Sequence, residues 1–198
     1  MIQSVLLSFV MLFSSGEGTK TTYTVDTDAS SVAWVGKKVT GQHNGVVDLK
    51  TGSFEFSEGK LVGGSFVVDM TSIEVQDLSG EYKGKLEGHL KSDDFFGAEK
   101  YPSSNFVITK VKSNGAGKYD ITGDLTIKEK TEKITFPAQL VEANGKVTGV
   151  ASLTIDRSKY DVKYGSGSFF DDLGDKTIYD DFELTVNIVG VENNQGTK

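Results

Sequence analysis

The sequence contains no cysteine among its 198 residues, and it has only 2 prolines and 2 histidines. Without cysteine the chain forms no disulfide and offers neither a thiol nucleophile nor a thiolate ligand for a metal. Acidic residues outnumber basic ones: the chain has 28 Asp and Glu and 21 Lys and Arg, which gives a formal net charge of -7. This acidic balance argues against a nucleic-acid partner, which requires a basic face that displaces counterions.

Sequence motifs of common enzyme classes are absent as well. The chain has no GxSxG, no HExxH and no glycine-rich phosphate-binding loop. Gly165-Ser166-Gly167 lacks a strand-to-helix context, which favours a flexible turn. An acidic cluster could hold Ca²⁺, but its spacing lacks the ligand order of an EF-hand, so a solvated surface is favoured. The cluster comprises Asp171, Asp172, Asp175, Asp180 and Asp181.

The N-terminal segment departs from the general polarity of the chain. Met1 to Ser15 carries no charged side chain, and the run from Val5 to Phe13 is nearly all apolar. It is shorter than the about 20 residues of a spanning helix and resembles the centre of a secretory signal, although no Lys or Arg precedes it. We expect residues 1–20 to be a signal peptide or leader, with a retained amphiphilic segment as the alternative. Residues 191–198 form a polar tail.

From Tyr23 to Ile188 the dominant hydrophobic period is two, which is typical of strands with one buried face. In 119–128, for example, Tyr119, Ile121, Leu125 and Ile127 share a face. Turn signals such as Asn144-Gly145 separate the runs and supply the positive φ angles of tight hairpins. Short alternating strands at this spacing predict an all-β antiparallel sandwich or barrel.

Two segments interrupt this alternation. The first, Thr71–Ser103, contains a helix candidate at about 77–91, in which Asp77 can cap the start. Its apolar residues recur every four positions: Leu78, Tyr82, Leu86 and Leu90. Three glycines in this stretch cost about 1 kcal/mol each relative to Ala, so we expect a short helical cap packed across a sheet or barrel end. The second segment, Asp156–Thr177, is a long loop that is expected to have a function or to form a cap.

Several strand positions that should be bulky are small, namely Gly123, Ala138, Gly149 and Ala151. A small barrel is either filled by its own side chains or leaves room for one ligand. Small inward residues beside Phe and Leu favour a cavity. The alternative is that the glycines relieve strain at bends or bulges. The residues by themselves leave both possibilities open.

Two cationic groups stand near aromatic residues. Lys37, Lys38 and His43 follow the strand that carries Trp34. Farther along, Arg157, Lys159 and Lys163 alternate with Tyr160 and Tyr164. Charge-assisted donors beside aromatic walls suit an anionic head group, whereas isolated surface lysines are the commoner situation.

Several motifs resemble the YceI-like family. They are Leu90-Lys91-Ser92-Asp93-Asp94-Phe95-Phe96 with Lys100-Tyr101-Pro102 and Phe106, then Thr122-Gly123-Asp124-Leu125-Thr126-Ile127-Lys128, Ile134-Thr135-Phe136-Pro137 and, more loosely, Asp156-Arg157-Ser158. The resemblance covers about Tyr23 to Val189. Glu129 replaces the family's usual glycine, and Lys133 replaces a frequent proline.

The resemblance implies a lipocalin-like, eight-stranded antiparallel β-barrel over residues 21–190, in a periplasmic or secreted protein. It implies an apolar tunnel for one long amphiphile, such as a polyprenyl quinone, a polyprenyl phosphate or a fatty amphiphile, with no catalytic residue, metal or cofactor. We expect a monomer or homodimer that makes transient membrane contact. The candidate lining residues are Trp34, Phe54, Phe56, Phe66, Met70, Phe106, Ile121, Leu125, Phe136, Gly149, Ala151 and Leu153. The candidate head-group residues are Lys37, His43, Arg157 and Lys163.

Two other functions remain as alternatives. The barrel mouth could serve a hydrolase or isomerase, with His43 or His89 as the general base. A filled barrel could instead act as an interaction or stress protein without a ligand.

Overall fold

The computed structural model describes residues 19–193 of the chain. The strands in this range are β1 (Lys20–Lys38), β2 (Gly41–Ser57), β3 (Lys60–Val75), β4 (Ser103–Gly115), β5 (Lys118–Ile127), β6 (Lys130–Ala143), β7 (Lys146–Asp156) and β8 (Ile178–Glu192). The helix α1 (Gly80–Lys91) lies between β3 and β4, and the 3₁₀ turns η1 (Arg157–Tyr160) and η2 (Gly174–Lys176) lie between β7 and β8. No helix in the described range is long and apolar enough to cross a membrane. Most of the expected leader and polar tail lies outside this range.

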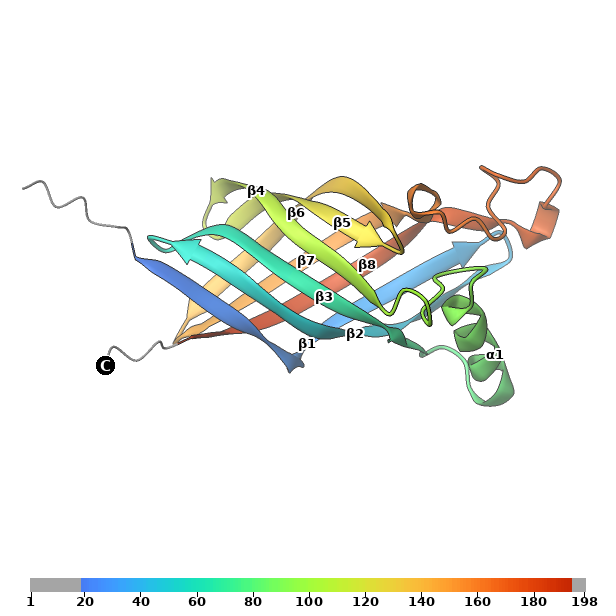
Figure 1. Ribbon diagram of the computed structural model, residues 1–198, viewed down its shortest axis with the longest axis horizontal. Helices are drawn as coiled ribbons and strands as arrows, with labels where there is room; N and C mark the ends of the chain where they lie inside the picture. Colours follow the sequence, from blue (N-terminus) through green and yellow to red (C-terminus); the bar gives the residue numbers. More distant parts are fainter. Residues whose placement is uncertain (1–18, 194–198) are drawn as a thin grey trace, which may run out of the picture.

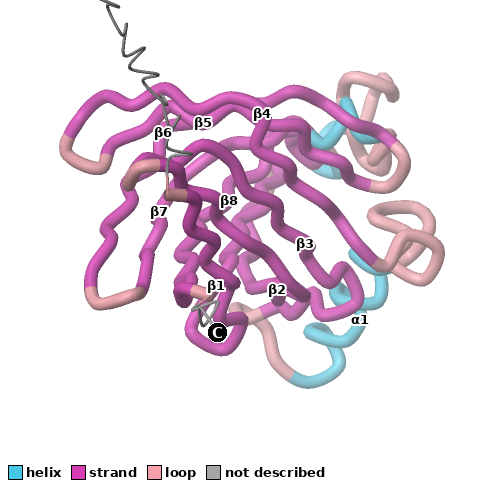
Figure 2. Tube along the Cα trace, turned by 60° about the vertical axis from the view of Figure 1, so that its left-hand side comes forward, coloured by secondary structure: helices cyan, strands magenta, loops and turns pink. Residues whose placement is uncertain are grey.

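The strands form a closed barrel in chain order, with β8 paired to β1 and every neighbour antiparallel. This confirms the prediction of an all-β, eight-stranded antiparallel barrel. The barrel is elongated, with α1 and the β7–β8 connection at one end and the start of β1 and the end of β8 at the other (Figure 1). Figure 2 shows the helices and the longer loops gathered at the α1 end, with tight hairpin turns at the other end. The predicted hairpin at Asn144-Gly145 has positive φ angles of 53° and 71°.

The helical cap differs in detail from the prediction. The helix starts at Gly80 rather than near residue 77, and Ser79 is its N-cap residue. Asp77 does not cap it, because its carboxylate accepts hydrogen bonds from His43 Nδ1 at 2.8 Å and from the Asn44 backbone N–H at 3.0 Å. Tyr82, expected on the packed face, is 74% exposed. The periodicity therefore found the helix and three half-buried residues of the predicted apolar face, Leu78, Leu86 and Leu90, but it misplaced the cap and included the exposed Tyr82.

Polar contacts tie α1 to β3. Lys83 Nζ lies 2.6 Å from Glu74 Oε1. Glu87 Oε1 accepts a hydrogen bond from the Val75 backbone N–H at 2.9 Å. No residue of the helix is fully buried, and Leu90 packs against the barrel core, so polar contacts and one apolar contact together hold the helix beside the barrel end.

Aromatic side chains fill the barrel end opposite α1. Tyr23 and Phe56 are buried and meet edge to face, with ring centroids 5.3 Å apart. Gly190 is required here, because an added Cβ would lie 2.9 Å from Val147 Cγ1 and 3.0 Å from Tyr23 Cβ. This end is closed by tight packing, so any internal space must open elsewhere.

Candidate functional site

Two adjoining cavities lie in the barrel interior between the filled end and α1. We call the one bordering the filled end the inner cavity, with a volume of about 130 Å³, and the one beside α1 the mouth cavity, with a volume of about 150 Å³. Their walls share four side chains: Val32, Val68, Leu125 and Leu184. The two cavities therefore adjoin along the barrel, and we call the space from the α1 end to the aromatic residues of the filled end the tunnel.

The inner cavity is lined only by Val, Leu, Ile, Phe, Ala and Gly residues. Such a wall offers no hydrogen bond, so it suits a hydrocarbon chain and disfavours polar groups. Ala138 and Ala151 contribute space to it. Gly149 also borders it, and an added Cβ there would lie 3.2 Å from Phe54 Cζ.

Gly123 behaves differently from the other small residues. An added Cβ at Gly123 would lie 2.3 Å from Phe106 Cζ and 2.5 Å from the Val107 carbonyl oxygen. The ring of Phe106 therefore fills the space that this glycine leaves. Of the four small residues noted in the sequence, Gly123 serves close packing, whereas the other three border the cavity.

The mouth cavity combines apolar walls with a few polar side chains. Trp34, Met70, Phe95 and Phe96 contribute apolar surface. Lys37, Ser104, Arg157 and Asp181 also border it. The apolar inner cavity therefore matches the apolar chain of an amphiphile, and the mouth cavity matches its polar end.

The structure brings eleven of the twelve candidate lining residues to these walls. Nine border the inner cavity: Phe54, Phe66, Phe106, Ile121, Leu125, Phe136, Gly149, Ala151 and Leu153. Trp34 and Met70 border the mouth cavity. Phe56 borders neither cavity, because it packs against Tyr23 in the filled end.

Sequence reasoning missed several further lining residues. Those on β8 are Leu184, Val186 and Ile188. They share a strand face by alternation, so the pattern itself could have identified them. Phe95 and Phe96 reach the mouth cavity from the turn after α1, and no periodicity indicates where such a turn folds.

Arg157 is the most buried of the candidate head-group residues, with 2% exposure. Its guanidinium donates hydrogen bonds to three backbone carbonyls, those of Val162 at 2.8 Å, Ile178 at 3.0 Å and Tyr179 at 3.1 Å. Burial lowers the pKa of this guanidinium, and the Asp180 and Asp156 carboxylates oppose that shift. Arg157 thus joins the η1 turn to the start of β8 while bordering the mouth cavity.

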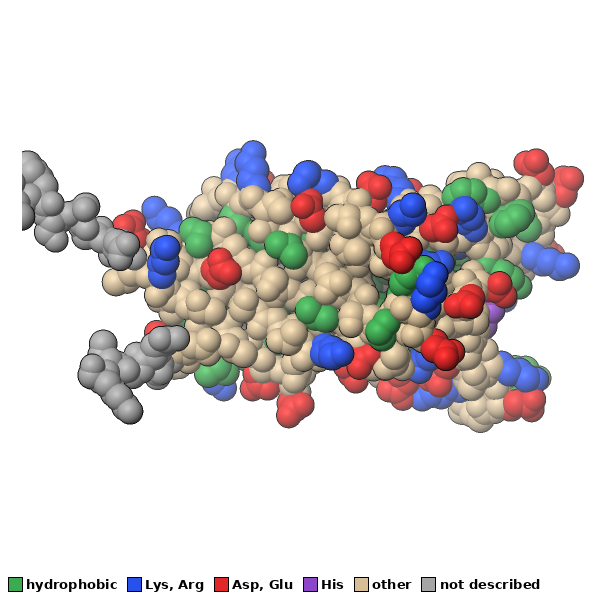
Figure 3. Space-filling view, in the orientation of Figure 1, with side chains coloured by type: hydrophobic (Ala, Val, Ile, Leu, Met, Phe, Trp, Pro, Cys, Tyr) green, Lys and Arg blue, Asp and Glu red, His purple; other side chains and the backbone are tan. Residues whose placement is uncertain are grey.

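The other three head-group candidates are each paired with a carboxylate. Lys37 borders the mouth cavity and pairs with Glu183. His43 pairs with Asp77 and lies outside both cavities. Lys163 lies 2.6 Å from Asp161 on the surface, and this hydrogen bond lowers the pKa of the Asp161 carboxyl. Charges of both signs are interspersed on the face in Figure 3 and are dense at the α1 end.

The residues that could support other chemistry are dispersed. His89 packs edge to face against Phe95 and Tyr164, apart from the His43–Asp77 pair. Ser166 is fully buried, and its hydroxyl accepts a hydrogen bond from the Ser168 backbone N–H, so the expected flexible turn is a packed one. Within residues 19–193, no group of three or more His, Asp or Glu side chains is placed to hold a metal ion.

A closed, eight-stranded antiparallel barrel with an apolar interior defines the class of this protein. The chain belongs to the YceI-like family, since the profile of the YceI-like domain matches residues 23–190. A UPF0312 protein of Vibrio parahaemolyticus is 32% identical over 130 residues, which cover 61% of this chain and 66% of that protein. A UPF0312 protein of Photorhabdus laumondii is 31% identical over 140 residues, which cover 71% and 69%. The matches thus span about two thirds of these relatives.

Solved structures share the fold. BcnA of Burkholderia cenocepacia superposes with a TM-score of 0.66 at 26% identity, covering 83% of this chain and 98% of that one. A domain from Saccharophagus degradans gives a TM-score of 0.64 at 14% identity, covering 86% and 98%. That domain is described as polyisoprenoid-binding and as implicated in plant cell wall breakdown. At 14% identity the likeness extends to the fold alone.

Proposed function

We propose that this protein binds one long-chain amphiphile, such as a polyisoprenoid, without transforming it. The apolar chain occupies the inner cavity and the polar end lies in the mouth cavity. The observation that carries the proposal is a tunnel whose inner part is wholly apolar and whose mouth alone is bordered by cationic side chains. The polyisoprenoid-binding description of the Saccharophagus degradans domain supports the same ligand class.

The energetics favour a chain over a compact polar ligand. Each buried CH₂ group contributes about 0.8 kcal/mol, so one five-carbon isoprene unit contributes about 4 kcal/mol before the cost of immobilisation. In contrast, a polar group moved into the inner cavity would lose its hydrogen bonds to water without replacement. The tunnel therefore selects for chain length and apolarity, and the mouth selects the head group.

The physiological role that fits this binding is transport or storage of the amphiphile in an aqueous compartment. A periplasmic or secreted location agrees with the apolar N-terminal run, and loading implies transient contact with a membrane. The carrier functions as a monomer or homodimer.

Native mass spectrometry of the protein purified from its own cells, followed by solvent extraction, tests the proposal. We expect a bound species whose mass equals that of an extractable prenyl or fatty amphiphile. A purified barrel that carries nothing and takes up neither prenyl phosphates, prenyl quinones nor fatty acids would contradict it.

A further inference from the structure

The barrel wall is interrupted at two seams, β3–β4 and β6–β7, and a surface groove lies over the second. The backbones of β6 and β7 pair only from Ala138–Ala151 to Ala143–Lys146, which is six residue pairs. Beyond that point, residues 130–137 of β6 and 152–156 of β7 are not paired with each other. Each segment still pairs on its other side, with β5 up to Lys130 and with β8 up to Asp156. We call this unpaired stretch the side gap.

The sequence explains where the pairing stops. Pro137 directly precedes Ala138, the last β6 residue paired to β7. Proline has no N–H to donate to a ladder and is confined to strand edges. Lys130 and Lys133 lie on the same unpaired segment, and charged edge residues discourage pairing with another chain. Pro137 and the two lysines therefore account for a β6 segment that does not pair with another strand on its β7 side.

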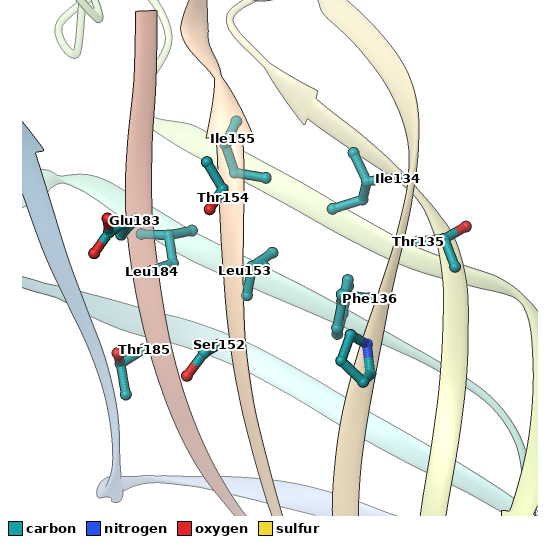
Figure 4. Close-up of a pocket in the computed structure, with 11 residues that line it drawn as sticks. Ile134, Thr135, Phe136, Ser152, Leu153, Thr154, Ile155, Glu183, Leu184 and Thr185 are labelled. Carbon is teal, nitrogen blue, oxygen red and sulfur yellow. The ribbon is translucent and has the colours of Figure 1, made fainter. Parts of the chain in front are cut away.

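An outer groove of about 410 Å³ lies over the side gap. Figure 4 shows its residues on β6, β7 and β8. Hydroxyl-bearing residues line part of it, namely Thr135, Ser152, Thr154 and Thr185. Ile134, Phe136, Leu153 and Leu184 line both this groove and the inner cavity. At the side gap, no β6–β7 backbone hydrogen bonds close the wall. These apolar side chains therefore form the separation between the outer groove and the inner cavity.

Packed structure bounds the side gap at both ends. Toward α1, Tyr160 of η1 is 1% exposed and packs in a buried cluster with Ile127 and Ile155. Toward the filled end, the gap stops at the Ala138–Ala151 pair. The gap is therefore a defined interruption of the wall and not a frayed strand end.

At both ends of the barrel, packed or hydrogen-bonded elements border the interior. One end is packed with aromatic side chains. At the other, Arg157 holds three backbone carbonyls together beside the mouth cavity. Opening the side gap requires rotamer changes in a few apolar side chains and breaks no β6–β7 ladder hydrogen bond. Rotamer changes are fast relative to the opening of packed elements.

The size of the interior also points to this route. Neither cavity reaches the roughly 300 Å³ at the lower end of ordinary ligand pockets. A long chain therefore has to displace lining side chains or extend into adjoining space. The outer groove adjoins the inner cavity across four apolar side chains, Ile134, Phe136, Leu153 and Leu184.

We propose that the side gap between β6 and β7 is a lateral portal through which the apolar chain of an amphiphile passes into and out of the inner cavity. This inference rests on the proposed function. The chain passes over Ile134, Phe136 and Leu153, and the hydroxyl rim of the groove stays in contact with water.

The test bridges the gap covalently. The chain has no cysteine, so the double variant Thr135→Cys/Thr154→Cys carries one exposed thiol on each side of the gap. A flexible bis-maleimide joins them, and mass spectrometry verifies the bridge. The matched control is Thr126→Cys/Thr131→Cys, which lies outside the outer groove and joins β6 to its paired neighbour β5, where the two hydroxyl oxygens lie 2.8 Å apart. The probe is a prenyl chain carrying an anthraniloyl fluorophore.

We expect the gap-bridged protein to load and release the probe at least tenfold more slowly than the unbridged variant, with the same final occupancy. The control bridge should leave both rates unchanged. Equal rates in the gap-bridged and control proteins would overturn the portal while leaving the proposed function intact. An unmodified protein that takes up no probe at all would instead refute the proposed function, and the portal with it.

Discussion

Ala151→Phe is the substitution that separates a binding tunnel from a filled barrel most sharply. Ala151 lies on the inner cavity wall, opposite Ala138 on β6 and Val186 on β8. A phenyl ring at this position projects into the cavity of about 130 Å³. It should remove the room for about one isoprene unit, which is about 4 kcal/mol of burial at about 0.8 kcal/mol per carbon. The expected loss of affinity is about 10³-fold.

The free energy of unfolding of Ala151→Phe separates a cavity from a filled core, because an added ring destabilises only a core that has no space for it. The ring enters existing space, so the free energy of unfolding should stay within about 1 kcal/mol of the parent value. Gly123→Ala adds a single methyl group, yet its Cβ would lie 2.3 Å from Phe106 Cζ. That variant should lose about 1–3 kcal/mol. Val141→Phe adds a ring at a position 57% exposed on β6 and should change neither quantity.

Fluorescence titration with the anthraniloyl prenyl probe and urea unfolding measure the two effects on the same samples. Parental affinity in Ala151→Phe would show that the chain does not occupy the inner cavity. Destabilisation as large as that of Gly123→Ala would show that the space beside Ala151 is already filled. Either result would refute the reasoning.

Three other substitutions test the mouth and its surroundings. Arg157→Lys should lower the free energy of unfolding by about 2–4 kcal/mol, because a lysine ammonium cannot reproduce the three guanidinium hydrogen bonds to backbone carbonyls. Thermal unfolding measures this loss, and an unchanged melting temperature would contradict the structural role of Arg157. Burial raises the pKa of Tyr160 to about 12, with the Glu132 and Asp156 carboxylates adding to the shift. Its neutral form therefore contributes stability that is complete below pH 10 and is lost, by about 2 kcal/mol, as the pH rises toward 12. Tyr160→Phe should remove that part of the alkaline loss in urea titrations between pH 9 and 12, and an identical pH profile would contradict the assignment. His43→Ala should lower the free energy of unfolding by less than about 1 kcal/mol. It should leave probe binding unchanged, since the His43–Asp77 pair lies outside both cavities, and a loss of binding would place the ligand at this pair instead.

The strands could be predicted because each has one buried face, and burial of one face imposes a period of two. That period also found most of the tunnel wall, since inward residues such as Phe54 and Leu153 alternate with outward ones. It could not separate lining from filling, because both point inward. Phe56 continues the same face as Phe54 yet lies in the filled end, and only the packing against Tyr23 distinguishes them.

Predictions from local sequence were wrong where a residue distant in the sequence bonds or packs against the same side chain. Asp77 has the right chemistry for a helix cap, but β2 supplies His43 and the Asn44 N–H to its carboxylate. Gly123 and Gly149 are identical in sequence terms, and their neighbours alone make one a packing requirement and the other a cavity wall. Pro137 was a usable signal, because a proline within a strand indicates an edge.

The position of a bound chain tests the central claim most directly. A crystal structure of the protein grown with a long prenyl amphiphile should show continuous density from the mouth cavity, past Leu125 and Leu184, to the ring of Phe54. Density confined to the outer surface, around an interior closed by its own side chains, would contradict it.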